Sequence, residues 1–189
     1  PLWVTVTSPG TELDAADRGI GCLGVAVAGY AEQERRTREY HRRIQSCEPV
    51  SSVVNDSVTT LNYLYCHPDH AVAAKRGLQM LGRFGLENAN LLFTREAFPS
   101  NVYQSLANLA PRAASGGSAA DAAPVPEGTA IGDPGRILAA IKHCESIGID
   151  GINFMVNGCE VLSQAEVLDS MRLFAREVMP HFRSAGKAA

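Results

Sequence analysis

The 189-residue sequence has little of several features that would assign a function at once. Its formal net charge is only −3, which argues against a nucleic-acid or anionic-membrane partner. No apolar run is long enough to cross a bilayer, so we expect no membrane span. The motifs G-x-S-x-G and H-E-x-x-H and the phosphate-binding loop of nucleotide hydrolases are also absent, which removes three common enzyme classes.

Cysteine pairing is also improbable from the sequence. The five cysteines are Cys22, Cys47, Cys66, Cys144 and Cys159, and no two have the C-x-x-C spacing. Because the count is odd, we expect reduced thiols in a cytoplasmic protein, most of them small buried apolar residues. The run CHPDH brings Cys66, His67 and His70 close together, but a zinc site needs a second ligand cluster and none appears. We therefore predict no metal site, and interpret His67 as a polar group at the carboxyl end of a strand.

The chain alternates between apolar stretches typical of strands and amphipathic stretches typical of helices. The predicted strands are 2–7, 22–28, 57–66 and 149–156, and the predicted helices are 11–18, 32–45, 68–84, 134–147 and 163–178. The strands are mostly apolar rather than alternating, which favours a parallel sheet covered on both faces. Right-handed crossovers leave two architectures, an open doubly wound sheet or part of a barrel.

One stretch, residues 108–129, interrupts this rhythm with Ala, Gly, Ser and Pro. Such a composition buries little apolar surface, so we expect a flexible insertion in an otherwise single domain spanning 1–189. The preceding residues 96–109 are compatible with short helices.

The turn T-S-P-G-T between the first strand and its helix is the best candidate binding site. Turns at the carboxyl ends of parallel strands bind ligands in α/β proteins, and free N–H groups at a helix start attract anions. Thr7, Ser8 and Thr11 add hydroxyl donors, and Gly10 allows close backbone approach to a phosphate. The alternative is an ordinary capped turn, with Thr11 as N-cap and Asp14 completing a capping box.

Two other patterns favour structural interpretations. The run from Gly19 to Gly24 matches G-x-G-x-x-G, but it leaves a helix and enters a strand, the reverse of a dinucleotide fingerprint. Gly19 is better interpreted as a helix C-cap. The basic helix 32–45 is most simply a solvated face with weak ion pairs. The predicted pairs are Glu32 with Arg36, Glu34 with Arg38 and Glu39 with Arg43.

Three segments then resemble the luciferase-like, flavin-dependent oxidoreductases. LWVTVTSPGTELDAADRGIG is similar to that family's fifth strand and following helix, and IGDPGRILAAIKHCESIGIDGINFMVNG to its approach to the eighth strand. LDSMRLFAREVMPHF resembles the closing helix. The resemblance implies the C-terminal half of a TIM (β/α)8 barrel, with four βα units corresponding to strands 5–8.

The resemblance also implies a function. Members bind reduced flavin, usually FMN, or the deazaflavin F420, and the flavin enzymes use O2 to oxidise a small organic molecule. The turn after the fifth strand holds the cofactor phosphate, which implies Thr7, Ser8, Gly10 and Thr11 as cofactor ligands. Some relatives carry an acidic residue where Thr7 stands. We therefore expect a flavin-dependent monooxygenase, with a flavin reductase as an electron source.

The family's first four strands, which carry much of the flavin-ring pocket, have no counterpart in this sequence. Four βα units cannot close an eight-stranded barrel, and their edges need a partner. The expected partner is a missing N-terminal half or a second copy. A truncated, dimeric flavin-binding protein without turnover is the alternative function.

Overall fold

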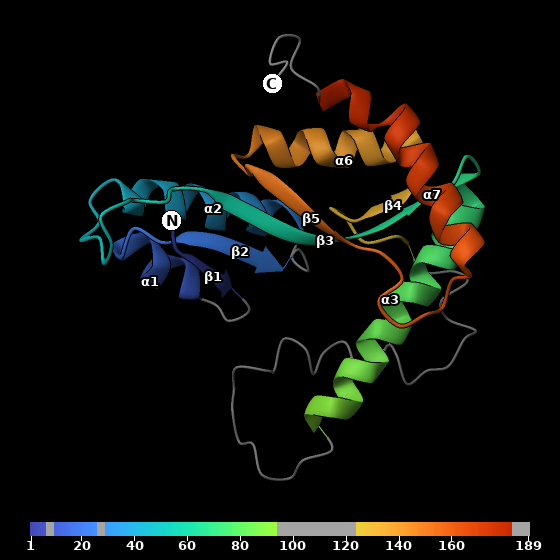
Figure 1. Ribbon diagram of the computed structural model, residues 1–189, viewed down its shortest axis with the longest axis horizontal. Helices are drawn as coiled ribbons and strands as arrows, with labels where there is room; N and C mark the ends of the chain where they lie inside the picture. The colour runs from blue at the N-terminus through green and yellow to red at the C-terminus, as the bar shows by residue number, and fades with distance from the viewer. Residues whose placement is uncertain (7–9, 26–28, 94–123, 183–189) are drawn as a thin grey trace.

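The computed structural model describes residues 1–6, 10–25, 29–93 and 124–182. Its strands are β1 (Trp3–Val6), β2 (Gly21–Val25), β3 (Val58–Cys66), β4 (Ala130–Gly132) and β5 (Gly151–Met155). Its helices are α1 (Thr11–Asp17), α2 (Tyr30–Ile44), α3 (His70–Phe93), α6 (Pro134–Ser146), α7 (Gln164–Glu177) and the 3-10 helix η2 (Met179–Phe182). Helices alternate with strands along the chain (Figure 1).

All strand pairings in the described sheet are parallel, which confirms that prediction. β3 is central: it pairs with β2 and β5 along its first half and with β4 at its end, where Leu64 lies opposite Ala130. β1 pairs with β2, and β5 pairs with β3. Among the described strands, β1 and β5 therefore each keep one edge without a partner.

The predicted number of βα units was too low, because residues 130–132, which form β4, were assigned to no strand. β4 has only three residues, too few to show a period of two. It is nevertheless fully buried, and Leu64–Cys66 supplies its hydrogen-bonding partner. The structure thus has five βα units rather than four. Residues 96–109 and most of 108–129 lie outside the described residues.

The core divides according to which face of β3 is covered. Leu64 and Cys66 pack with α6 and α7, whereas their neighbours Tyr63 and Tyr65 pack with α3. A further cluster joins α1, α2 and α6 to the first three strands. Helices therefore cover the sheet from both sides at its carboxyl end. This arrangement explains why the strands are apolar throughout rather than alternating.

Capping residues set the start of the later helices. Asp133 caps α6 by accepting from the N–H groups of Gly135 and Arg136, and Ser163 forms a capping box with Glu166 at α7. The expectation for α3 was less accurate, because this helix begins at His70 rather than at Pro68, directly after Asp69. Its carboxylate accepts from Ala71 and Val72, and the helix runs nine residues past position 84.

Candidate functional site at the carboxyl edge of the sheet

The predicted turn after β1 is described only in part. Thr7 and Ser8 lie outside the described residues, and Gly10 and Thr11 begin α1. Gly10 is the N-cap, with a φ of 90°, a conformation that favours glycine. The expected cap at Thr11 and its capping box are wrong, since no side chain caps this helix and Thr11 is its first residue. A Cβ at Gly10 would meet nothing within 4 Å, so the backbone is open to close approach.

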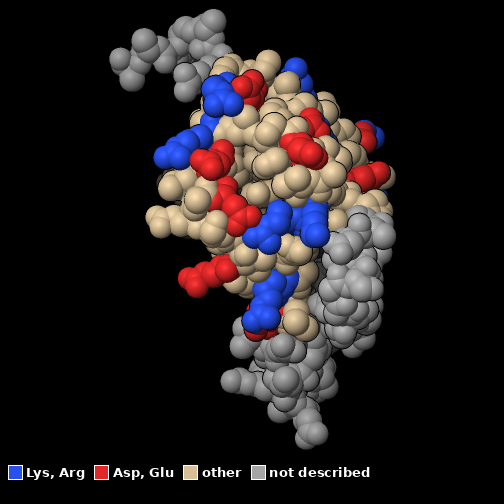
Figure 2. Space-filling view, turned by 90° about the vertical axis from the view of Figure 1, so that its right-hand side faces the viewer, with Lys and Arg blue, Asp and Glu red and all other residues tan. Residues whose placement is uncertain are grey.

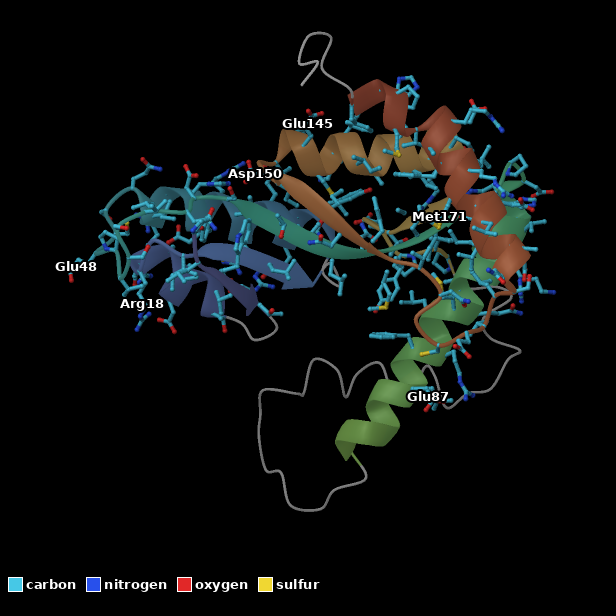
Figure 3. The ribbon with its side chains drawn as sticks, in the orientation of Figure 1. Arg18, Glu48, Glu87, Glu145, Asp150 and Met171 are labelled. Atoms are coloured by element: carbon cyan, nitrogen blue, oxygen red, sulfur yellow. The ribbon has the colours of Figure 1, made fainter. Side chains whose placement is uncertain are left out.

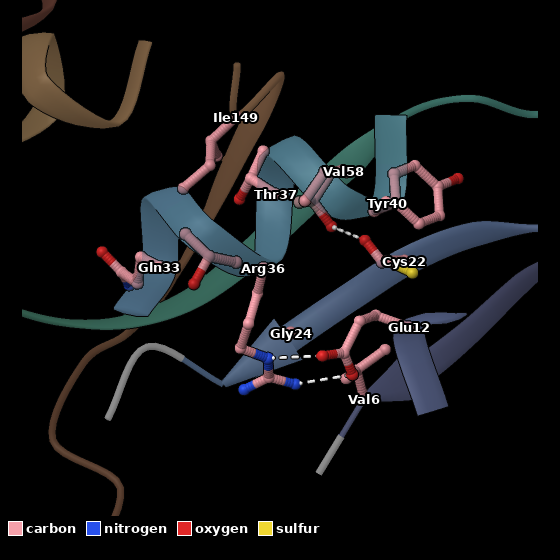
Figure 4. Close-up of a pocket in the computed structure, with 12 residues that line it drawn as sticks. Val6, Glu12, Cys22, Gly24, Gln33, Arg36, Thr37, Tyr40, Val58 and Ile149 are labelled. Atoms are coloured by element: carbon pink, nitrogen blue, oxygen red, sulfur yellow. Dashed lines mark hydrogen bonds and ion pairs between the residues drawn. The ribbon is translucent and has the colours of Figure 1, made fainter. Parts of the chain in front are cut away.

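A carboxylate from the same helix already contacts this turn. Glu12 Oε2 accepts from the Gly10 N–H at 3.1 Å, and Arg36 donates to both carboxylate oxygens at 2.7 and 2.9 Å (Figure 4). Burial opposes ionisation of Glu12, but the hydrogen bonds from Arg36 and the backbone and the charge of Arg36 outweigh it and lower its pKa. The same pair raises the pKa of Arg36. The Glu12 carboxylate therefore already places a negative charge beside Gly10, and Arg36 neutralises it.

This pairing corrects the ion pairs expected along α2. Arg36 reaches Glu12 on another helix instead of Glu32, which pairs with Arg35. Arg43 reaches Asp17 on α1, and Glu39 pairs with Arg42. Only the predicted pair of Glu34 with Arg38 is confirmed. Two arginines of this helix thus join α2 to α1 rather than forming a merely solvated face.

A small cavity lies between α2 and the sheet beside this pair. It has a volume of about 60 Å³ and is lined by Glu12 and Arg36 and by residues of β1, β2 and β3 (Figure 4). Ligand pockets typically span 300–1,000 Å³, so a flavin ring does not fit inside it. The Gln33 Oε1 atom on its wall is buried and has no hydrogen-bond partner among the residues that the structure describes. The space suits a few bridging water molecules.

The thiol on the wall of this cavity is unreactive. Burial is the main cause that raises the pKa of Cys22 to about 12, and burial likewise raises the pKa of Cys66 to about 11. Nucleophilic and metal-binding cysteines require a thiolate, so neither residue suits those roles. Among the described residues, no three His, Cys, Asp or Glu side chains gather as a metal site.

Sequence reasoning missed a second polar group at the same edge. His70 Nδ1 lies 3.2 Å from Asp133 Oδ2, which joins the segment after β3 to the segment after β4. The backbone N–H of Arg136 is the largest of the contacts that lower the pKa of Asp133. His67 Nδ1 lies 3.0 Å from the backbone nitrogen of Asp69 and 3.2 Å from the backbone oxygen of the same residue. The G-D-P sequence signals the cap at Asp133, but not its partner.

The segment after β5 is held by its own side chains. Asn157 has a positive φ of 57°, and its amide bonds both the N–H and the C=O of Leu162. This side chain is therefore committed to closing the β5–α7 loop. On the neighbouring surface over α3 and α7, acidic and basic side chains are intermixed (Figure 2), and Arg76 bonds Glu166 across these helices. Within the described part of the chain, no helix is long and apolar enough to cross a membrane.

No family model and no curated protein matches this sequence. Solved structures do match its fold. Monooxygenase RslO1 from Streptomyces bottropensis aligns with 96% of this chain and 48% of its own, at 19% identity and a TM-score of 0.57. The coenzyme F420-dependent tetrahydromethanopterin reductase from Methanopyrus kandleri aligns with 97% and 51%, at 13% identity and a TM-score of 0.60.

Riboflavin lyase RcaE, solved with modified FMN and riboflavin, aligns with 100% of this chain and 44% of its own, at 14% identity and a TM-score of 0.60. The chain thus spans about half the length of these structures. At such low identity the likeness shows the fold, an arrangement of parallel βα units common to all of them.

Proposed function

We propose that this chain forms one half of a luciferase-like barrel that catalyses a flavin-dependent oxidation. The observation that carries this proposal is the alignment of nearly the whole chain with half of a monooxygenase, half of an F420-dependent reductase and just under half of an FMN-containing lyase. The five parallel βα units then correspond to the C-terminal part of the barrel. Further βα units complete it and contribute the rest of the pocket.

The carboxyl edge of the sheet is the place where the cofactor phosphate binds in this proposal. Thr7, Ser8 and Thr11 supply hydroxyl donors, and the open backbone at Gly10 allows the phosphate to come close. Glu12 restricts this fit, because its carboxylate already takes the Gly10 N–H. The phosphate therefore depends on the hydroxyl groups and on the remaining N–H groups of the turn rather than on the Gly10 N–H.

FMN is the proposed cofactor and F420 the alternative, since both present a phosphate to such a turn. When bound, a reduced flavin supplies the electrons that activate O2 for oxidation of a small organic substrate. This chain positions the phosphate and forms one wall of the pocket. The imidazole of His70, oriented by Asp133, stands at the carboxyl ends of β3 and β4 and can exchange a proton there. A flavin reductase is the proposed electron source.

Titration of the purified chain with FMN, followed by flavin fluorescence, tests the proposed phosphate site. Saturable binding should weaken at least tenfold in a double variant, Ser8→Ala with Thr11→Ala, because each hydrogen bond to a charged group contributes about 1.5 to 3 kcal/mol. A matched control removes the hydroxyls of Ser51 and Ser146, which lie before β3 and β5 at the opposite edge. Equal affinity of the two double variants would contradict the assignment. Binding without oxidation of any substrate by the completed barrel would favour the non-catalytic alternative.

A further inference from the structure

Two residues of the loop between β5 and α7 have a left-handed backbone although neither of them is glycine. Asn157 has a φ of 57° and Glu160 has a φ of 53°. In the described part of the chain, no other non-glycine residue has a positive φ. This conformation is unfavourable for residues that carry a Cβ atom, although asparagine tolerates it better than most. Such residues cluster at functional sites, where the surrounding structure holds them in place.

The side chain explains the left-handed backbone at Asn157 but not at Glu160. The Asn157 amide donates to the Leu162 C=O at 2.8 Å and accepts from the Leu162 N–H at 2.7 Å, which closes the loop. The Glu160 carboxylate is exposed and has no hydrogen bond or ion pair with any described residue. Its backbone N–H donates to the Asn157 C=O at 3.1 Å, a bond that any residue but proline could form. Glycine would fit this position with less strain, so stability does not account for a glutamate here.

The loop brings Glu160 to the carboxyl edge of the sheet, beside an apolar wall. It follows β5 and lies against α3 (Figure 1), and a Cβ on Gly158 would lie 2.8 Å from Met155 Sδ and 3.6 Å from Phe84 Cδ2. Met155 and Phe84 are half-buried and pack on the cluster that contains Tyr63. Ligands of parallel α/β proteins bind at this edge. An anion without a partner therefore lies next to apolar side chains that are still partly accessible.

We propose that Glu160 binds the ammonium group of a small organic amine, whose hydrocarbon part lies against Met155 and Phe84. This inference rests on the proposed function, because it names the class of substrate that binds at the carboxyl edge. The ammonium group supplies both the positive charge and the hydrogen-bond donors that the carboxylate lacks. The apolar wall and the bound hydrocarbon exclude water from one side of the pair, which strengthens the attraction.

Two glycine variants distinguish a structural side chain from one that is kept for a ligand. Asn157→Gly and Glu160→Gly both relieve a left-handed backbone, and both increase the freedom of the unfolded chain in the same way. Asn157→Gly should lower the urea midpoint of unfolding, because the two bonds to Leu162 are lost. Glu160→Gly should leave the midpoint unchanged or raise it. An equal loss in the two variants would overturn the proposal, because Glu160 would then have a structural role.

Titration of the purified chain with hexylammonium chloride, followed by the NMR shifts of the backbone amides of residues 155–162, tests the proposed binding directly. Glu160→Gln removes the charge but keeps the shape of the side chain, and it should weaken binding by about tenfold or more. Hexanol has the same hydrocarbon chain without the charge, so it should bind the native chain more weakly by a similar factor. The control Glu48→Gln changes an exposed carboxylate at the opposite edge of the sheet (Figure 3) and should bind hexylammonium as the native chain does.

Absence of hexylammonium binding by the folded chain, or equal binding by the native chain and Glu160→Gln, would overturn the proposal. Neither measurement involves a flavin, so a chain that fails to bind FMN can still show the amine site. Conversely, a chain that binds FMN at the turn after β1 but ignores hexylammonium would retain the proposed function and lose only this substrate class.

Discussion

Replacing Arg36 by methionine removes the cation that neutralises Glu12. The Glu12 and Arg36 side chains are only 10% and 25% exposed, and two hydrogen bonds join them. Breaking a fully buried pair costs about 3 to 5 kcal/mol, mostly because one charge stays behind uncompensated. With this partial exposure, we expect Arg36→Met to lower the free energy of unfolding by about 2 to 3 kcal/mol at pH 7.

Urea unfolding across pH measures this loss and its cause. In the native chain the pKa of Glu12 is lowered, so its stabilisation is present above the ordinary value of 4.5 and is lost as pH falls. In Arg36→Met, burial raises that pKa, and protonation relieves the penalty, so the difference should shrink toward pH 4. Arg35→Met is the matched control, because its pair with Glu32 is exposed to solvent and such surface pairs contribute little to stability. Equal losses for the two variants, or a loss independent of pH, would refute the reasoning.

Three further predictions concern stability. Arg76→Met should raise the pKa of Glu166, which hydrogen bonds from Arg76 and Ser163 lower to about 2, and acid unfolding should begin at higher pH. Carboxyl titration by NMR measures this pKa, and an unchanged value would contradict the prediction. Gly10→Ala should lower the free energy of unfolding, measured in urea, by about 1 kcal/mol, because alanine is strained in the left-handed backbone conformation of this residue. An unchanged free energy of unfolding would show that the turn relaxes. Gly77→Ala should lower the free energy of unfolding by about 1 to 3 kcal/mol, because the Cβ of the alanine would clash with the Ile131 side chain. A variant more stable than the native chain would contradict this close packing.

Local signals in the sequence were sufficient to predict most of the strands and helices. Apolar runs bounded by glycine and proline located β1, β2, β3 and β5, and their lack of alternation predicted parallel pairing. The helix predicted at 163–178 agrees closely with α7 (Gln164–Glu177). Gly19, which was predicted as the C-cap of α1, has a φ of 66° and follows the observed C-cap, Arg18. β4 was missed because its strand character comes from pairing with Leu64–Cys66, which three residues cannot signal by themselves.

The side-chain pairs of the candidate site could not be predicted from the sequence, because they join segments that are distant along the chain. Arg36 has an acidic residue four positions before it, so helix spacing indicated Glu32, yet the buried Glu12 provides a better partner from another helix. His70 and Asp133 are likewise brought together only by the pairing of β3 with β4. Such pairs follow from tertiary packing, which local periodicity does not encode.

The most direct test of the proposed function compares FMN, F420 and riboflavin as ligands of the purified chain, with inorganic phosphate as a competitor. Riboflavin lacks the phosphate, so a cofactor held by its phosphate at the turn after β1 should bind at least tenfold more tightly than riboflavin. Phosphate should displace FMN or F420 but should leave riboflavin binding unchanged. Equal affinity for FMN and riboflavin, or no binding of any of the three by the folded chain, would contradict the assignment of a phosphate-binding turn to this half of the barrel.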